Sequence, residues 1–517
     1  MNRYVCMLAI ATTVDVYLPA QFDALKALIT QRDAVIVNLS AQLESLKQQF
    51  LNLRRMHFGA TSEKLSGQAE LFQDATTIPL PPQETIRVTY DRQRRGRPAL
   101  PKDLPRERVD YDLSEVEKAQ FDEIKRIGEE VSETLEYTPA KLVVIEHARA
   151  KYACRKDGQS TIRTAFAQPS PLPKSNAGAG LLAQILVATF ADHLPLYRQE
   201  AIFKRHGVDL PRSTLCEWKL GAGELLAVLR PALIAHTLAA PRLHSDDTTM
   251  PLIVAGRAST KTARLWGYLG AGARQGEDGA WVEHSPSVVF EFTDSRESVH
   301  PMRFLKDYVG YLQADAYSGY DAIYKSGRVI EVGCWAHARR KYFEVAKTQP
   351  TPGLAADALK WIAKLYAIES GIKERPPDEK LKVRQAESVP VLAQFKLWLE
   401  GHYPKLLPQG PLGLAFGYTL RHWGALHRYT ESGILAPDNN LLERQIRPIA
   451  KGRDAYLFIA AERAGHVAAT LYSLIGTCKL NAVEPYAYLK EVLRRLPQHP
   501  INRVAELLPF NWKSAIR

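Results

Sequence analysis

The sequence has few cysteines and no long hydrophobic run. Its 517 residues include five cysteines, which are scattered and odd in number. This pattern argues against a disulfide framework and is typical of a reducing compartment. No apolar run approaches the roughly 18 residues of a membrane-spanning helix. We take residues 1–20 as an extension without the other features of an export signal, and we expect a cytoplasmic protein.

Acidic residues are also in the minority. The chain has 68 Lys and Arg against 56 Asp and Glu, a formal net charge of +12. Such a surplus favours a polyanionic partner, most simply nucleic acid. Hydrophobic residues make up 46% of the chain and aromatic residues 9%, as in a globular protein with a real core. The length is enough for several domains of roughly 100–200 residues each.

Apolar residues repeat every seven positions within residues 21–57. One register of the repeat is Phe22, Ile29, Ile36, Leu43 and Phe50. The other is Leu25, Arg32, Leu39, Leu46 and Leu53, in which Arg32 is the one exception to the apolar pattern. A repeat sustained over more than three or four heptads predicts a coiled coil, and with it a homodimer or higher oligomer. The alternative is one amphipathic helix that folds back on the protein's own core.

Residues 58–108 predict a linker, because they combine several prolines with a basic segment. Between Arg92 and Arg108 there are seven Lys or Arg against two Asp or Glu. Arginines around a glycine have the form of a hook that enters the DNA minor groove. The candidate contacts in this hook are Arg94, Arg95 and Arg97. A solvated, flexible linker is the alternative for so short a match.

Residues 109–164 predict a small domain of mixed elements that resembles a zinc-binding domain without its ligands. Tyr152–Gly158 has the shape of a zinc-knuckle tip, but it holds only Cys154, and no cysteine pair precedes it. Structural zinc needs four ligands, usually thiolates and imidazoles. We therefore predict a degenerate domain with no structural zinc.

Residues 165–235 predict a helical, helix-turn-helix-like DNA-binding domain. One helix is expected over residues 195–206, and a glycine turn separates it from a short second helix. Thr214 and Glu217 suit a capping box at the start of that second helix. Helical hairpins are common, and one that binds nothing is the alternative. The candidate DNA contacts near the second helix are Arg212 and Lys219.

The pattern changes to strands in residues 236–345. Three apolar strands predict a meander, and the first is expected to end at Asp246 and Asp247. A helix follows, then a short buried strand that presents Asp315, then a fifth strand. This is the order of a ribonuclease H-like core, an α/β fold in which the first and fourth strands lie side by side. Asp246 and Asp315 are therefore predicted to meet.

A third carboxylate is expected from a helix in residues 431–480. Asp438 is the predicted N-cap, Glu443 lies in the first turns, and Pro448 is expected to limit the far end. The alternative for Glu443 is an ion pair with Arg447 four residues on. Residues 346–430 predict an α-helical insertion into the core, and residues 481–517 a C-terminal helical element.

Three carboxylates in one place repel one another, by up to about 4 kcal/mol for a pair at ~4 Å and an effective dielectric of ~20. Divalent cations neutralise such a cluster, and hard oxygen ligands select Mg²⁺ or Mn²⁺. Two such ions can activate a water or a 3′-hydroxyl and stabilise the leaving oxygen of an in-line phosphoryl transfer.

Taken in order, these motifs resemble the DDE transposases of the insertion sequence sixty-six family over nearly the whole chain. The residues that carry the resemblance are His244–Thr248, Gln313–Tyr320, Cys334–Lys341, Asp438–Pro448, Arg453 with Tyr456–Phe458, and Ser473–Thr477. The resemblance implies that Asp246, Asp315 and Glu443 are the catalytic and metal-binding triad. It also implies a bacterial enzyme that binds transposon inverted repeats and catalyses DNA cleavage and strand transfer with two Mg²⁺ or Mn²⁺ ions, with possible accessory proteins of the same element.

The sequence departs from the family pattern at Asp247, where the family commonly has Glu, and in the zinc-binding domain, where only Cys154 remains. Cys334 and His337 have the spacing of half a metal site, with a packed turn contact as the alternative. Two other functions stay open, a catalytically inactive DNA-binding derivative and a ribonuclease H-like nuclease. Candidate phosphate contacts around the core are Arg339, Arg340, Lys341, Arg444, Arg447, Lys451 and Arg453.

Overall fold

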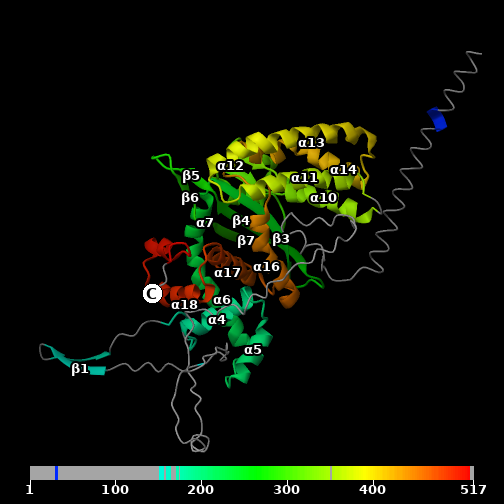
Figure 1. Cartoon of the computed structure of the whole chain (residues 1–517). Helices are drawn as coiled ribbons and strands as arrows, with labels where there is room; N and C mark the ends of the chain where they lie inside the picture. Colours follow the sequence, from blue (N-terminus) through cyan, green and yellow to red (C-terminus); the bar gives the residue numbers. More distant parts are fainter. Residues whose placement is uncertain are drawn as a thin grey trace, which may run out of the picture. The chain divides into compact units, whose positions relative to one another are not determined.

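The protein is a mixed α/β chain whose contacts divide it into two units, Met1–Ile78 with Gln168–Arg517, and Pro79–Ala167 (Figure 1). The computed structural model describes residues 30–32, 142, 151–156, 159–164, 170–173, 175–349 and 352–512. Residues 30–32 are helical. The rest of the predicted coiled coil and the basic linker with its arginine hook lie outside the described residues.

The described part of the smaller unit is a β-hairpin. Strands β1 (Lys151–Lys156) and β2 (Gln159–Thr164) pair antiparallel, with Cys154 opposite Thr161. Cys154 therefore belongs to a β-strand.

A five-stranded mixed sheet is the centre of the larger unit, with the order β7-β4-β3-β8-β9. Within this sheet, the strands β3, β4 and β7 form an antiparallel meander. Strand β3 also pairs parallel with β8, which pairs parallel with β9. Both the meander and the side-by-side first and fourth strands are as the sequence predicts. The bounds are β3 Arg242–Leu252, β4 Lys261–Ala271, β7 Ser287–Thr293, β8 Gly310–Gln313 and β9 Val329–Val332, and a separate short hairpin is formed by β5 Ala273–Gln275 and β6 Trp281–Glu283.

The sequence predicts that the first strand ends at its acidic residues, and this prediction is wrong. Strand β3 pairs with β4 over its full length, from Arg242 opposite Ala271 to Leu252 opposite Lys261. That ladder keeps the chain extended beyond Asp246. The strand that ends near Asp246 is β8, which pairs with β3 only as far as His244.

The two faces of the sheet pack against different helices, because successive strand residues point to opposite faces. Leu265 and Leu269 of β4 belong to the core on one face, and Trp266 and Tyr268 to the core on the other. The second core also takes residues of the two short helices, α8 (Val299–Phe304) and α9 (Asp321–Lys325). The helices that contribute to the first core are α4 (Ala179–Phe190), α6 (Arg212–Leu226), α7 (Arg230–Leu238), α16 (Asn440–Tyr456), α17 (Glu462–Leu480) and α18 (Pro485–Arg495).

The segment between the fifth strand and α16 is helical, as the sequence predicts, and has a core of its own around Trp335, Phe395 and Phe416. In Figure 1 these helices lie together, in yellow-green to yellow-orange, beside one end of the sheet. They are α10 Trp335–Thr348, α11 Leu354–Gly371, α12 Pro377–Val383, α13 Val389–His402, α14 Pro411–Arg421 and α15 Trp423–His427.

A buried arginine fastens this helical insertion to the segment that leads into α16. Arg384, in a π-helical turn and with a side chain only 2% exposed, donates to both carboxylate oxygens of Glu369, at 2.8 and 2.7 Å. It also donates to the carbonyls of Tyr429, Ser432 and Leu435. Since these groups are buried, the contacts fix the path of the chain toward α16.

The helical pair before the sheet differs from its prediction at the second helix. Helix α5 (Leu196–Arg205) ends before Gly207, whose φ of 81° suits glycine. Helix α6 begins at Arg212 with Pro211 as N-cap, so Thr214 lies inside the helix and does not cap it. Proline presets the extended conformation there without a side-chain cap. Among the described helices, none is both long and apolar enough to cross a membrane.

Candidate functional site

The strand register places Asp246 and Asp315 just beyond the point where the pairing of β3 with β8 ends. The last parallel pair of β3 and β8 is His244 with Gln313, so each aspartate lies two residues beyond it (246 − 244 = 2 and 315 − 313 = 2). Gln313 is buried and donates to the carbonyls of Gly333 (3.1 Å) and Ala436 (2.8 Å). These contacts tie the end of β8 to the end of β9 and to the segment before α16.

Helix α16 lies against the strand that carries Asp246, and a glycine makes room for it. Gly267 is the cross-strand partner of Asp246. A methyl group at Gly267 would lie 2.9 Å from Phe290 and 3.0 Å from Leu442 of α16. Because Leu442 precedes Glu443, the missing side chain at Gly267 lets the glutamate approach the two aspartates.

Two of the three carboxylates, those of Asp246 and Glu443, have raised pKa values. Burial, together with the negative charges of Asp315 and Glu443, raises the pKa of Asp246 well above its ordinary value. Burial and the charges of Asp438 and Asp315 raise the pKa of Glu443 to about 7, against the opposing effect of Arg340. Buried carboxylates whose ionisation is opposed by neighbouring negative charge could hold a divalent cation. Their oxygens suit Mg²⁺ or Mn²⁺.

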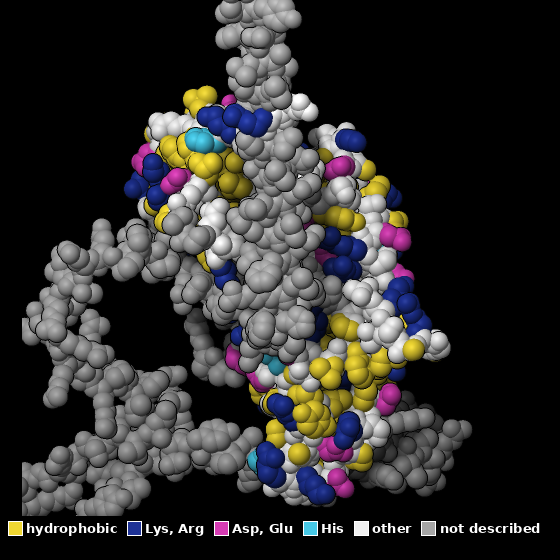
Figure 2. Space-filling view, turned by 90° about the vertical axis from the view of Figure 1, so that its right-hand side faces the viewer, with side chains coloured by type: hydrophobic (Ala, Val, Ile, Leu, Met, Phe, Trp, Pro, Cys, Tyr) yellow, Lys and Arg dark blue, Asp and Glu magenta, His cyan; other side chains and the backbone are white. Residues whose placement is uncertain are grey.

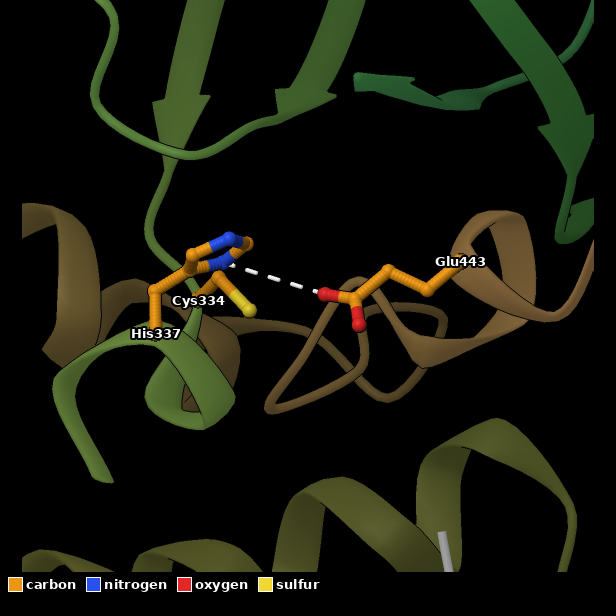
Figure 3. A group of neighbouring side chains, drawn as sticks. All are labelled: Cys334, His337 and Glu443. Carbon is orange, nitrogen blue, oxygen red and sulfur yellow. Dashed lines mark ion pairs between the residues drawn. The ribbon is translucent and has the colours of Figure 1, made fainter. Parts of the chain in front are cut away.

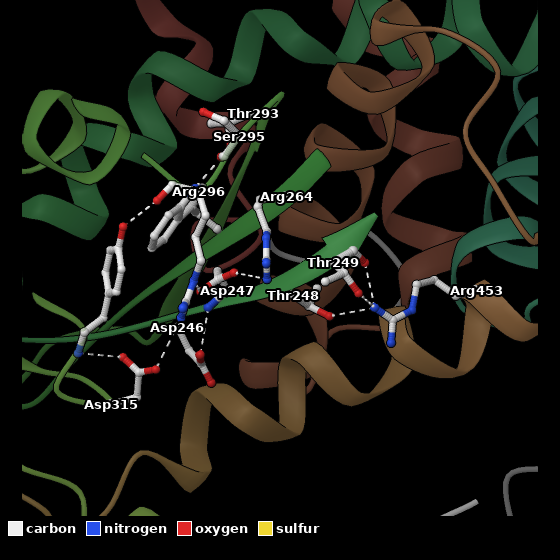
Figure 4. A network of polar contacts seen from close by, with 12 residues as sticks. Asp246, Asp247, Thr248, Thr249, Arg264, Thr293, Ser295, Arg296, Asp315 and Arg453 are labelled. Carbon is white, nitrogen blue, oxygen red and sulfur yellow. Dashed lines mark hydrogen bonds and ion pairs between the residues drawn. The ribbon is translucent and has the colours of Figure 1, made fainter. Parts of the chain in front are cut away.

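Asp247 points to the opposite face, and its charge is already compensated (Figure 4). Its side chain is 3% exposed, and both its oxygens are bound at 2.8 Å, one by Arg264 and one by Arg296. A carboxylate held by two guanidinium groups has little capacity left for a metal ion. The alternation of the strand therefore separates the two acidic neighbours, which the sequence alone left ambiguous.

Arg296 is a member of the site that the sequence did not indicate. Its Nη2 lies 3.5 Å from Asp315 Oδ2, and its guanidinium lies 4.4 Å from the centre of the Tyr317 ring, whose hydroxyl donates to the Arg296 carbonyl. Arg296 follows β7 in a turn with no motif around it. Only the folded chain brings it beside Asp315.

The turn after Asp315 is held by the aspartate itself. The backbone N–H of Tyr317 donates to Asp315 Oδ1 at 3.2 Å. Between them Ala316 adopts a φ of 60°, in the left-handed region that non-glycine residues rarely occupy. Such a conformation persists where its surroundings hold it in place, and it is frequent at functional sites.

Asn439 joins β3, α10 and α16 and is a second residue whose role the sequence did not reveal. Its amide nitrogen donates to the carbonyl of Ser245 at 3.0 Å, and its amide oxygen lies 2.8 Å from His244 Nδ1. Its backbone N–H donates to the Cys334 sulfur at 3.2 Å. Since Asn439 is fully buried, this set of contacts fixes where α16 begins relative to Asp246.

Two details of α16 differ from the prediction. The N-cap is Asn439 rather than Asp438, whose carboxylate instead accepts from the N–H of Asn440 (3.0 Å) and the hydroxyl of Tyr366 (2.8 Å). Pro448 lies inside the helix, which continues to Tyr456. A proline removes one N–H, and the packing of α16 on β3 and β4 compensates for that loss.

Some of the predicted DNA contacts are bound to other residues or partly buried in the protein, and others are open to solvent. Arg212 pairs with Glu200, Lys219 is half-buried, and Arg453 donates to the hydroxyls of Thr248 and Thr249 and to the carbonyl of Thr249. Figure 2 shows Lys and Arg spread over one face among hydrophobic side chains. Of the others described, Lys341, Arg444 and Lys451 are exposed, and Arg339, Arg340 and Arg447 are half-buried.

A sequence model described as "Transposase IS66 family" matches residues 174–467, which include the sheet, the insertion and α16. The chain belongs to this transposase family. Further models match the N-terminal part as "Transposase C of IS166 homeodomain" (45–109) and "zinc-finger binding domain of transposase IS66" (120–156), and the C-terminal part as "IS66 C-terminal element" (473–510). The zinc-finger match covers a segment in which Cys154 is the only cysteine, so the absence of structural zinc stays a prediction.

Long relatives occur in Sinorhizobium fredii. The uncharacterized protein y4hP is 33% identical over 508 residues, covering 93% of this chain and 89% of the relative. The uncharacterized protein y4jD is 32% identical over 508 residues, covering 93% and 96%. A third, y4qI, is 34% identical over 397 residues, covering 75% and 72%. The first two relatives align over nearly the whole chain, and the names of all three assign no activity.

Proposed function

We infer that this transposase is a DDE enzyme whose ribonuclease H-like core cleaves DNA and transfers strands by in-line phosphoryl transfer. The observation that carries the proposal is that burial and the charges of Asp315 and Glu443 raise the pKa of Asp246, while burial and the charges of Asp438 and Asp315 raise the pKa of Glu443. Asp246, Asp315 and Glu443 come from β3, the turn after β8 and α16. The sheet order with parallel β3, β8 and β9 supports the core assignment. Family membership supplies the substrate class, DNA.

Asp246, Asp315 and Glu443 would hold two Mg²⁺ or Mn²⁺ ions, which activate the attacking water or 3′-hydroxyl and stabilise the leaving oxygen. The residues fit this role because burial and neighbouring negative charges raise the pKa values of Asp246 and Glu443, and a divalent cation would relieve both effects. Asp247 is excluded from the ligand set by Arg264 and Arg296. Arg296 keeps a positive charge beside Asp315 and is suited to meet a DNA phosphate there.

The exposed basic side chains near the site would hold the DNA backbone. Arg444 and Lys451 are exposed on α16, and Arg340 lies close enough to Glu443 to oppose the rise of its pKa. Phosphate contacts position the duplex but carry no sequence information. Reading of the inverted repeats is assigned to the N-terminal region, with Arg94, Arg95 and Arg97 in the basic linker and Arg212 and Lys219 in the helical pair.

The test uses labelled inverted-repeat DNA with Mg²⁺ and compares wild type with Asp315→Asn. Cleavage and strand joining that are lost in the variant, with DNA binding retained, support the proposal. Binding without cleavage by wild type would identify a catalytically inactive DNA-binding derivative instead. Nicking without joining would identify a nuclease. Asp247→Asn separates the two acidic neighbours, since it should retain more activity than Asp246→Asn.

A further inference from the structure

A second group of metal-ligating side chains adjoins the proposed triad (Figure 3). The Cys–His–Glu cluster consists of Cys334, His337 and Glu443, whose ligand atoms all lie within 4.8 Å of one another. Cys334 is the N-cap of α10 and His337 lies in the first turn of that helix, so both side chains reach the same point. Glu443 faces them from α16.

The imidazole nitrogen at the centre of this cluster has no hydrogen-bond partner among the described residues. His337 Nδ1 is buried, and its nearest partner is Glu443 Oε1 at 3.8 Å, which is too far for a hydrogen bond. A nitrogen and an oxygen ligand of one tetrahedral zinc ion, with bonds of about 2.0–2.2 Å, lie roughly 3.3–3.6 Å apart. The 3.8 Å between the two atoms is close to this spacing, so a small side-chain adjustment would let both bind one ion.

We propose that Cys334 Sγ, His337 Nδ1 and the Glu443 carboxylate form a site for a Zn²⁺-like cation, which competes with the hard-metal site for Glu443. Thiolate and imidazole ligands select zinc over Mg²⁺, and three protein ligands leave one position for water. The binding site rests on the geometry of the cluster alone. The competition rests also on the proposed function.

Binding takes place by loss of the thiol proton. Burial raises the pKa of the Cys334 thiol, so the S–H bond breaks only as the S–metal bond forms, and the proton passes to solvent. Burial lowers the pKa of His337 below its ordinary value, which keeps a lone pair available on the imidazole. The N–H of Asn439, 3.2 Å from the sulfur, stabilises the resulting thiolate. No oxidation or reduction is involved.

A cation in the Cys–His–Glu cluster would take at least one oxygen of Glu443 from the triad. Zinc would then inhibit the Mg²⁺-dependent reaction at concentrations set by Cys334 and His337. The site would act as a switch that senses thiophilic metals.

Cobalt titration of the chelator-treated, full-length protein tests the site without DNA. A thiolate-to-cobalt charge-transfer band should appear in wild type and vanish in Cys334→Ser. His337→Gln should keep a weaker site, with cobalt affinity lower by roughly tenfold or more. Cys478→Ser, which removes another buried thiol, is the matched control and should keep the band. Cys154→Ser should keep it too, and loss of the band there would overturn the proposal.

Activity assays supply the second arm. Zn²⁺ added to the Mg²⁺ reaction should inhibit wild type, and His337→Gln should require roughly tenfold more zinc for half inhibition. Equal zinc sensitivity of the two proteins would overturn the competition. If the protein cleaves DNA but shows no cobalt band, the proposed metal site is wrong and the proposed function stands. If it shows the cobalt band but never cleaves DNA, the metal site stands and the proposed function is wrong.

Discussion

Asp246 and Asp247 are adjacent in β3, but their side chains point to opposite faces of the sheet and meet different surroundings. They are neighbours in sequence, yet one faces α16 and Glu443 and the other faces Arg264 and Arg296. The first has a carboxylate that resists ionisation, and the second is fully paired. The pleat of β3 alone thus gives the two adjacent side chains different surroundings, and we propose metal binding only for Asp246.

At the residue scale, Glu443→Gln should stabilise the metal-free protein at high pH. The pKa of Glu443 is about 7, above its ordinary 4.5, so the folded state holds the proton more tightly than the unfolded state. The free energy of unfolding therefore falls as the pH rises from about 5 through 7, by roughly 2–3 kcal/mol. Thermal unfolding at pH 5 and pH 8 measures the difference between wild type and variant.

The gain from Glu443→Gln should be seen at pH 8 and be absent at pH 5. Mg²⁺ should raise the Tm of wild type at pH 8 and have less effect on the variant. Glu506→Gln serves as the control, because Arg503 lowers the pKa of Glu506 and its removal brings no gain. A lower Tm of the metal-free Glu443→Gln variant at pH 8 would contradict the prediction.

Asp247→Asn tests the charge compensation on the opposite face. The Asp247 side chain is almost fully buried and binds two guanidinium groups, so loss of its charge should destabilise the protein by about 1–3 kcal/mol. Asp294→Asn removes one partner of the more exposed Lys261–Asp294 pair at 2.7 Å and should cost less than about 1 kcal/mol. Equal losses in denaturant unfolding would show that burial does not set the strength of these pairs.

At the element scale, the position of α16 depends on Gly267. A methyl group there would meet the buried Phe290 ring at 2.9 Å and Leu442 of α16 at 3.0 Å. Gly267→Ala should destabilise the protein by about 1–3 kcal/mol and should weaken Mg²⁺ binding, because Glu443 moves with Leu442. Calorimetric Mg²⁺ titration, together with thermal unfolding, measures both effects.

Gly401→Ala is the matched control for Gly267→Ala. Gly401 lies in α13, and a methyl group there meets nothing within 4 Å, so the change should stabilise the helix by up to about 1 kcal/mol and leave Mg²⁺ binding as it is. If Gly267→Ala left both stability and Mg²⁺ affinity unchanged, the close approach of α16 to β4 would have no bearing on the site.

At the scale of the whole molecule, the net charge of +12 should make DNA binding strongly dependent on salt. Lys451→Gln should weaken binding to all sequences alike and reduce the salt slope by about 1, because Lys451 is exposed on α16. Arg453→Gln should mainly lower the Tm, since Arg453 donates to Thr248 and Thr249 of β3. Binding isotherms at several salt concentrations distinguish the two variants.

The sequence by itself determined the strand order and the helical character of the segment after the fifth strand. It also singled out three acidic residues, whose role stays a prediction. Hydrophobic periodicity and the spacing of acidic residues are local properties, so they can be read directly from the sequence. The end of β3, the N-cap of α6 and the passage of α16 through Pro448 were predicted wrongly, because pairing with β4 and packing on the sheet override local signals.

Only the tertiary structure decided how the site is assembled. Arg296 stands in no motif, and the motif that contains Asn439 does not reveal its contacts. Both reach the site because a turn after β7 and the start of α16 converge on β3. Cys334 and His337 lie close to Glu443 in the structure, although they are about a hundred positions away in the sequence (443 − 337 = 106). Such contacts depend on which strand faces and helices meet, and that is settled by the packing of the whole core.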